Sequence, residues 1–288
     1  MKISLRLLPL FFLLSACGRL DSILYTPQQT PETWLQIQPF SEFQIASQKV
    51  VFVQPSTSII VYFLGLLTIG VGLYFLKLRD GQRSRFWWGV ALLLWGIGAL
   101  LAGTSYEAFS YAIKCEGRTA CLWTSWWEIA YLIVSVWSID AMMLAVAFTS
   151  TEGKLRKILS VYSIVNAVFY FAVVMAGAFI PVKFLISFEL LLIVAAPSVI
   201  AFFVINGWRY AKHKLKSDLV ALGAWLWLGL TIAAYFLYLI SGNTTVLWEK
   251  GFWFSENDVL HIGLIIWMIY LALVLAPHVR DANQEISK

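Results

Sequence analysis

The sequence predicts an all-α membrane protein, built as a bundle of seven transmembrane helices with the N-terminus outside and the C-terminus in the cytoplasm. Of its 288 residues, 60% are hydrophobic and only 13% are charged, whereas a soluble domain carries about 25% charged residues. The apolar residues gather into seven runs, each close to the about 20 residues that a helix needs to cross a bilayer. These runs cover roughly residues 58–76, 86–106, 126–149, 158–179, 183–205, 219–240 and 258–276.

Residues 1–17 have the features of a secretory signal peptide of the lipoprotein type. Lys2 and Arg6 precede an apolar core that is too short to span a bilayer. The end of this segment, Leu14–Cys17, resembles the lipobox of bacterial lipoproteins, in which the cysteine is acylated and becomes the new N-terminus. We therefore expect lipidation at Cys17. The alternative is an ordinary signal sequence or short anchor with a cysteine at this place by chance.

The rest of the chain divides into three parts. Residues 18–57 contain four prolines among Gln, Thr and Ser, which predicts a mostly extended extracytoplasmic segment with a short amphipathic patch near Trp34–Phe43. Residues 58–276 form the seven-span domain, in which Pro197 is expected to kink the fifth span. Residues 277–288 are then a cytoplasmic tail.

The distribution of basic residues predicts the orientation. Cytoplasmic loops of membrane proteins carry an excess of Lys and Arg. Here the basic residues concentrate in the first, third and fifth loops, and the opposite side carries fewer of them over longer stretches. The signal peptide predicts the same orientation, so we expect a multi-pass protein of the bacterial plasma (inner) membrane. The loop residues are Lys77, Arg79, Arg83, Arg85, Lys154, Arg156, Lys157, Arg209, Lys212, Lys214 and Lys216.

Two further cysteines share one polar loop. Cys115 and Cys121 are separated by Glu-Gly-Arg-Thr-Ala, and a pair this close in an oxidising compartment suggests a small disulfide loop. Two free thiols are the alternative interpretation.

Four ionisable residues are expected at one level near the outer surface. Glu107 ends the second span, Glu128 opens the third, and Asp258 opens the seventh with His261 three residues later on the same helix face. Three carboxylates and one imidazole suit a divalent metal such as Zn²⁺, Mn²⁺ or Fe²⁺. Such an ion could polarise a carbonyl group and activate water. Acidic residues facing water at helix ends are the simpler alternative, and Asp258 could merely cap its helix.

These positions resemble the CREST superfamily of seven-helix membrane hydrolases, which includes the alkaline ceramidases and the adiponectin/progestin receptors. Gly103–Glu107 is similar to the family's Ser-x-x-x-His motif, with Glu107 at the histidine place and the serine shifted to Ser105. Trp126–Glu128 resembles the acidic entry of helix three, and Asn257–His261 matches the last motif at His261. The resemblance implies a zinc-bound water that attacks a lipid amide or ester, with Glu128 as general base and Ser105 as the motif serine.

Two classes of function follow from the sequence. One is a metal-dependent hydrolase that acts on a membrane lipid near the outer surface. The other is a non-enzymatic seven-helix sensor, channel or membrane assembly factor. Asp140 and Glu189 lie inside predicted spans, where each could serve a proton or cation path or make an internal hydrogen bond. No nucleic-acid-binding motif is present, and the protein partners are not indicated.

Overall fold

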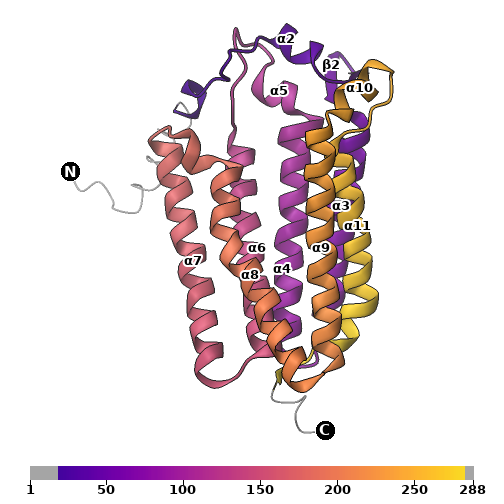
Figure 1. Ribbon diagram of the computed structural model, residues 1–288. Helices are drawn as coiled ribbons and strands as arrows, with labels where there is room; N and C mark the ends of the chain where they lie inside the picture. The colour runs from indigo at the N-terminus through magenta and orange to yellow at the C-terminus, as the bar shows by residue number, and fades with distance from the viewer. Residues whose placement is uncertain (1–18, 283–288) are drawn as a thin grey trace, which may run out of the picture.

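The computed structural model describes residues 19–282, so the predicted signal peptide and Cys17 lie outside the described residues. Seven long helices run side by side as one bundle (Figure 1), and each is long and apolar enough to cross a membrane. The chain is therefore a multi-pass membrane protein. The seven helices are α3 (Pro55–Lys77), α4 (Arg83–Ala102), α6 (Trp126–Ser150), α7 (Gly153–Phe179), α8 (Phe188–His213), α9 (Lys216–Ser241) and α11 (Glu256–Tyr270).

Short elements extend or connect the long helices. A π-helical segment, η2 (Gly103–Ala108), continues α4 and is followed by α5 (Ser110–Lys114). The remaining elements are η1 (Leu20–Ser22), α2 (Pro31–Gln36), β1 (Phe40–Ile45), β2 (Gln48–Val53), η3 (Lys183–Ile186), α10 (Asn243–Glu249), η4 (Leu271–Leu275) and η5 (Ala276–His278).

The fifth span begins later than the sequence predicted. Residues Lys183–Ile186 form a 3₁₀ turn, and Ser187 then starts α8 by accepting a hydrogen bond from the Leu190 N–H (3.3 Å). Glu189 consequently lies exposed in the first turn of α8, at the start of the span and not deep inside it. An acidic side chain there interacts favourably with the positive end of the helix dipole. Helix α8 then continues through Pro197, in its middle, and ends at His213.

The segment before the first span contains an antiparallel hairpin, which the sequence analysis did not predict. Strands β1 and β2 pair from Phe40 opposite Val53 to Ile45 opposite Gln48. The turn between them contains Ala46 in a left-handed conformation (φ 54°). Hairpin turns usually carry Gly, Asn or Asp at such positions. Since these signals are missing here, the hairpin was not apparent from the sequence.

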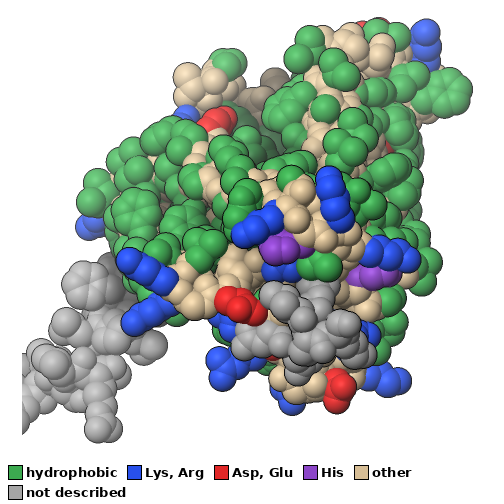
Figure 2. Space-filling model, turned by 60° about the horizontal axis from the view of Figure 1, so that its bottom comes forward, with side chains coloured by type: hydrophobic (Ala, Val, Ile, Leu, Met, Phe, Trp, Pro, Cys, Tyr) green, Lys and Arg blue, Asp and Glu red, His purple; other side chains and the backbone are tan. Residues whose placement is uncertain are grey.

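The two ends of the bundle differ in character. The hairpin end carries the β-hairpin, α2, α5 and α10, and the basic end carries the α6–α7 and α8–α9 turns (Figure 1). Lys and Arg side chains gather on the basic end, with histidine side chains among them (Figure 2). The basic residues of the predicted cytoplasmic loops thus lie together at one end of the bundle.

The N-terminal strap (residues 19–36) lies across the hairpin end. The Arg19 guanidinium donates to the carbonyl of Phe179 at the end of α7 (2.9 Å). Farther along, the N–H groups of Trp123 and Cys121 donate to the carbonyls of Ile23 and Gln29, each at 2.8 Å. The strap is therefore paired with the loop that contains the disulfide.

Helices α3 and α4 pack at very short range through glycines. A methyl group added to Gly96 would lie 2.8 Å from the Gly65 carbonyl oxygen and 3.0 Å from the Ile69 nitrogen. One added to Gly72 would lie 3.0 Å from the Gly89 carbonyl oxygen. Small residues allow such close backbone approach between membrane helices.

Four stacked aromatic rings join four helices near the basic end. Phe75 of α3 stacks on Trp88 of α4 (5.8 Å between ring centroids), and Trp88 stacks on Trp225 of α9 (5.7 Å). Trp225 also stacks on Phe202 of α8 (4.6 Å). The stack fixes these helices around a common core.

Replacing Gly96 with Ala should destabilise the fold by about 1–3 kcal/mol, because the new methyl group meets backbone atoms that cannot move aside. The matched control is Gly70→Ala on α3, where the described residues leave space around the added carbon. Thermal unfolding of both variants in detergent measures the difference. Equal stability of the two variants would contradict the close α3–α4 contact.

Candidate functional site

Glu107 lies buried in the π-helical segment at the hairpin end of α4. Its side chain is 4% exposed, and Oε2 has no hydrogen-bond partner among the described residues. Segments of π-helix occur frequently at functional sites. A buried carboxylate oxygen without a partner is costly in a membrane interior, so it marks a candidate site.

Asp258 helps to cap α11 with one carboxylate oxygen, and its other oxygen makes no hydrogen bond to a described residue. Its Oδ2 accepts hydrogen bonds from the Ser255 N–H (2.6 Å), the Ser255 hydroxyl (3.1 Å) and the Thr57 hydroxyl of α3 (3.0 Å). The contact with the Ser255 N–H is one half of a capping box. Its Oδ1 is buried and has no partner among the described residues. The capping role and a role as a cation ligand are thus compatible.

The structure brings Glu107 and Asp258 together. Their carboxyl groups lie close enough to interact electrostatically, although 151 residues separate them in the chain (258 − 107). Tyr62 of α3 lies beside Glu107 and shares a hydrogen bond with Thr104 (2.9 Å). Two buried carboxyl groups with like charge repel, so a proton or a cation between them stabilises the pair.

His261 lies one helical turn beyond Asp258 on α11. Its Nδ1 is buried and has no hydrogen-bond partner among the described residues. No three His, Cys, Asp or Glu side chains in residues 19–282 are grouped closely enough to hold a metal ion. The predicted set of four metal ligands is therefore not assembled in this structure.

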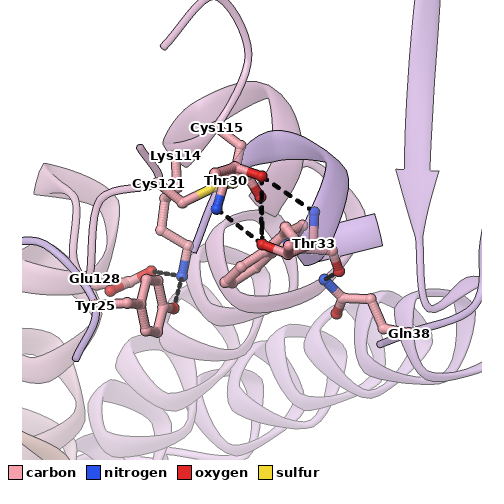
Figure 3. The surroundings of a disulfide bond; sticks show 9 residues. Tyr25, Thr30, Thr33, Gln38, Lys114, Cys115, Cys121 and Glu128 are labelled. Carbon is pink, nitrogen blue, oxygen red and sulfur yellow. Dashed lines mark hydrogen bonds and ion pairs between the residues drawn. A yellow bond between two sulfur atoms is a disulfide. The ribbon is translucent and has the colours of Figure 1, made fainter. Parts of the chain in front are cut away.

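Glu128, the fourth predicted ligand, forms a buried ion pair with Lys114. The Lys114 ammonium donates to Glu128 Oε1 at 2.8 Å, and both side chains are 2% exposed. The ammonium also lies over the rings of Trp34 (5.2 Å), Tyr106 (5.3 Å) and Tyr25 (5.9 Å). Glu128 is thus paired with a cation of the protein itself, which also contacts Tyr25 (Figure 3).

The disulfide loop positions Lys114 for this contact. Cys115 and Cys121 form a disulfide bond, as their spacing suggested, and the Leu122 N–H donates to the carbonyl of Lys114 (2.9 Å). Burial alone would lower the pKa of Lys114, but the Glu128 carboxylate and the Tyr25 hydroxyl outweigh burial and raise it. Lys114 therefore stays charged in the folded protein. The sequence did not indicate its pairing with Glu128, because a lysine beside a cysteine in a polar loop is usually solvated.

The other predicted site residues have structural contacts. The hydroxyl of Ser105 donates to the carbonyl of Leu101 in the preceding turn (2.9 Å). Asp140 is 3% exposed and accepts a hydrogen bond from the Asn166 amide of α7 (2.9 Å). The hydrogen-bonded interpretation of Asp140 therefore agrees with the structure, although its Oδ2 has no partner among the described residues.

Comparison with known proteins assigns the chain to a family. The seven apolar helices define a multi-pass membrane protein. The chain belongs to the family of unknown function DUF6962, whose profile matches residues 57–277. The match covers the bundle and leaves out the N-terminal strap and the hairpin. No curated protein and no solved structure matches the chain.

Replacing Lys114 with Met should destabilise the protein by about 3–5 kcal/mol, because Glu128 would keep a buried charge without a partner. The matched control is Lys49→Met, which breaks an exposed ion pair with Glu42 (2.7 Å) and should cost less than about 1 kcal/mol. Chemical unfolding of both variants measures the two changes. Equal effects would show that the buried pair contributes no more than the exposed pair.

The same ion pair predicts a dependence of stability on alkaline pH. Because the pKa of Lys114 is raised in the folded protein, its stabilising charge is fully present at neutral pH. It is lost as the pH rises through that raised value, above the ordinary pKa of lysine. The wild type should lose more stability in this alkaline range than Lys114→Met, as measured by unfolding at a series of pH values.

Proposed function

We propose that this protein is a cation-responsive, non-enzymatic seven-helix membrane protein in which Glu107 and Asp258 share a bound cation. The observation that carries the proposal is the buried pair itself. The two carboxyl groups interact, and each has an oxygen without a partner among the described residues. The cation is a shared proton in the simplest case, or a metal ion held by the two free oxygens.

The pair can act as a switch because its two members belong to different helices. Glu107 lies in η2, which continues α4, whereas Asp258 lies in the first turn of α11 and is held by Thr57 of α3. A bound cation attracts both carboxylates and draws these helix ends together. Without the cation the charges repel in a medium of low dielectric constant, so the ends separate. Cation binding would thereby change the distance between the ends of these helices at the hairpin end of the bundle.

We further propose the orientation that the basic loops predict. The α3–α4, α6–α7 and α8–α9 turns carry most of the basic residues, and they lie at one end of the bundle. The positive-inside rule assigns this end to the cytoplasm. The carboxyl pair would then face the outside of a bacterial plasma membrane, with lipidated Cys17 preceding the strap.

A lipid hydrolase is the second candidate, and His261 is the observation that favours it. The imidazole lies one turn from Asp258, with Nδ1 free of partners among the described residues. Imidazole and carboxylate are the ligand types that zinc prefers. The resemblance to the CREST superfamily concerns the same positions, Glu107 and His261. Glu128 does not belong to this candidate site, because Lys114 occupies it.

Cation binding is tested with purified protein in liposomes. Adding Zn²⁺, Mn²⁺ or Ca²⁺ at about 100 times the dissociation constant should stabilise the wild type by roughly 2.7 kcal/mol. If the cation is a proton, the wild type should show the infrared band of a protonated carboxyl group. Glu107→Gln and Asp258→Asn should each lose the response, and Glu116→Gln, an exposed glutamate of the neighbouring loop, should keep it. Absence of both signals from the wild type would reject the proposal.

The hydrolase candidate has its own test. It predicts stoichiometric bound metal in the purified wild type, lost in His261→Ala and in Glu107→Gln. It also predicts cleavage of an acyl-amide or ester lipid by the metal-loaded protein. Wild-type protein that binds no metal and cleaves neither lipid class excludes the hydrolase and leaves the shared proton as the remaining case.

A further inference from the structure

A small cleft opens at the basic end of the bundle, at the opposite end from the carboxyl pair. Its space, counted together with the part open to solvent, is about 280 Å³, and it lies between α4, α6, α8, α9 and the turns η4 and η5 that follow α11. The stacked rings of Trp88 and Trp225 form part of its wall. Of the described residues that line it, none is acidic.

Ser217 contributes a hydrogen-bonding group that the protein leaves unused. Its side chain lines the cleft and is 9% exposed, and its hydroxyl oxygen has no partner among the described residues. A buried hydroxyl usually has a partner, and an exception requires an explanation. A ligand in the cleft would supply the missing contact.

The start of α9 forms the second part of this site. Ser217 is the second residue of α9, a helix of 26 residues, and Leu215 at the N-cap offers no side-chain hydrogen bond. The first-turn N–H groups of a helix lack partners within the helix, and the helix dipole is positive at this end. Helix N-termini therefore bind phosphate and other anions.

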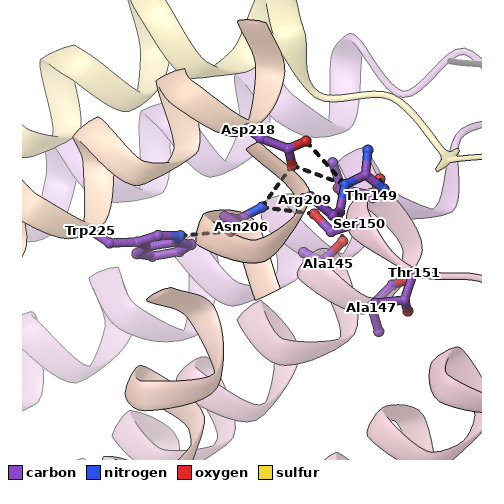
Figure 4. A network of polar contacts seen from close by, with 9 residues as sticks. All are labelled: Ala145, Ala147, Thr149, Ser150, Thr151, Asn206, Arg209, Asp218 and Trp225. Atoms are coloured by element: carbon purple, nitrogen blue, oxygen red, sulfur yellow. Dashed lines mark hydrogen bonds and ion pairs between the residues drawn. The ribbon is translucent and has the colours of Figure 1, made fainter. Parts of the chain in front are cut away.

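The acidic residue in the same turn does not repel an anion, because its charge is balanced. Arg209 donates from Nε to both oxygens of Asp218 (3.0 and 3.1 Å), and the Asn206 amide donates to Oδ1 (3.2 Å) (Figure 4). Asn206 also donates to Ser150 (2.9 Å) and accepts from Trp225 (3.0 Å). These polar groups bind one another, which leaves Ser217 available for a ligand.

His278 lines the same cleft from η5, the 3₁₀ turn that follows α11 and η4. Its Nδ1 lies 2.9 Å from the carbonyl oxygen of Val274, so this nitrogen donates and the ring is held in place. Exposed Lys214 and Lys216 flank the start of α9, on the end of the molecule where basic side chains gather (Figure 2). The surroundings therefore favour a negatively charged ligand.

We propose that this cleft binds a phosphate group, with the Ser217 hydroxyl and the first-turn N–H groups of α9 as donors. The neighbouring lysines add favourable charge, and the His278 side chain lines the site. The phosphate belongs either to the headgroup of an anionic phospholipid or to free inorganic phosphate. Both sources present the same oxygens, and basic sites between membrane helices are known to hold lipid headgroups.

The test compares purified wild type with Ser217→Ala, which removes only the hydroxyl, and with Ser241→Ala at the far end of α9 as the matched control. One arm measures the retention of phosphatidylglycerol and phosphatidylcholine by native mass spectrometry. The other measures the affinity for inorganic phosphate. Ser217→Ala should weaken binding about tenfold in the arm that reports the true ligand, and Ser241→Ala should match the wild type.

Selective retention of phosphatidylglycerol identifies a lipid phosphate, and binding of inorganic phosphate without a lipid preference identifies the free ion. His278→Gln provides a second variant, expected to weaken the same ligand while unfolding at the wild-type temperature. Equal binding by the wild type, Ser217→Ala and His278→Gln in both arms would overturn the proposal. Since the cleft and the Glu107–Asp258 pair share no residue, this result leaves the proposed cation site unaffected.

Discussion

The structure depends on one constraint: polar groups between membrane helices must find partners within the protein, because the hydrocarbon core offers no water. The two buried ion pairs satisfy this constraint at opposite ends of the bundle, Lys114 with Glu128 and Arg209 with Asp218. Several buried polar atoms lack a partner among the described residues, and oxygens of Glu107, Asp258 and Ser217 are among them. The two proposed sites are built on these three oxygens.

Much of the fold could be predicted from the sequence because bilayer thickness sets the length of an apolar helix. The seven predicted spans correspond to the seven long helices, with the largest difference at the end of α8, which extends to His213. Smaller elements could not be predicted in this way. The hairpin turns at Ala46, which is not a usual turn residue. The 3₁₀ turn before α8 contains Phe184, Leu185 and Ile186, so in the sequence it continues the apolar run.

The candidate site could be predicted only in part, because the level of a residue in the membrane does not give the direction of its side chain. Glu107 and Asp258 share a level and also lie close enough to interact electrostatically. Glu128 has a similar level but pairs with Lys114. That outcome depends on the disulfide loop, which folds back over the start of α6 and brings a distant lysine under aromatic rings. Such a fold-back depends on tertiary contacts, which span lengths and charge counts do not describe.

The N-terminal strap also constrains the order of events during biosynthesis. Its backbone partners, Cys121 and Trp123, follow Gln29 and Ile23 by 92 and 100 residues (121 − 29 and 123 − 23). A chain that emerges from the ribosome N-terminus first therefore exposes the strap long before its partners exist. The strap must wait, unpaired, while the first two spans insert and the disulfide loop follows. Any factor that recognises the nascent protein at this stage meets backbone groups of the strap that the finished protein pairs with the disulfide loop.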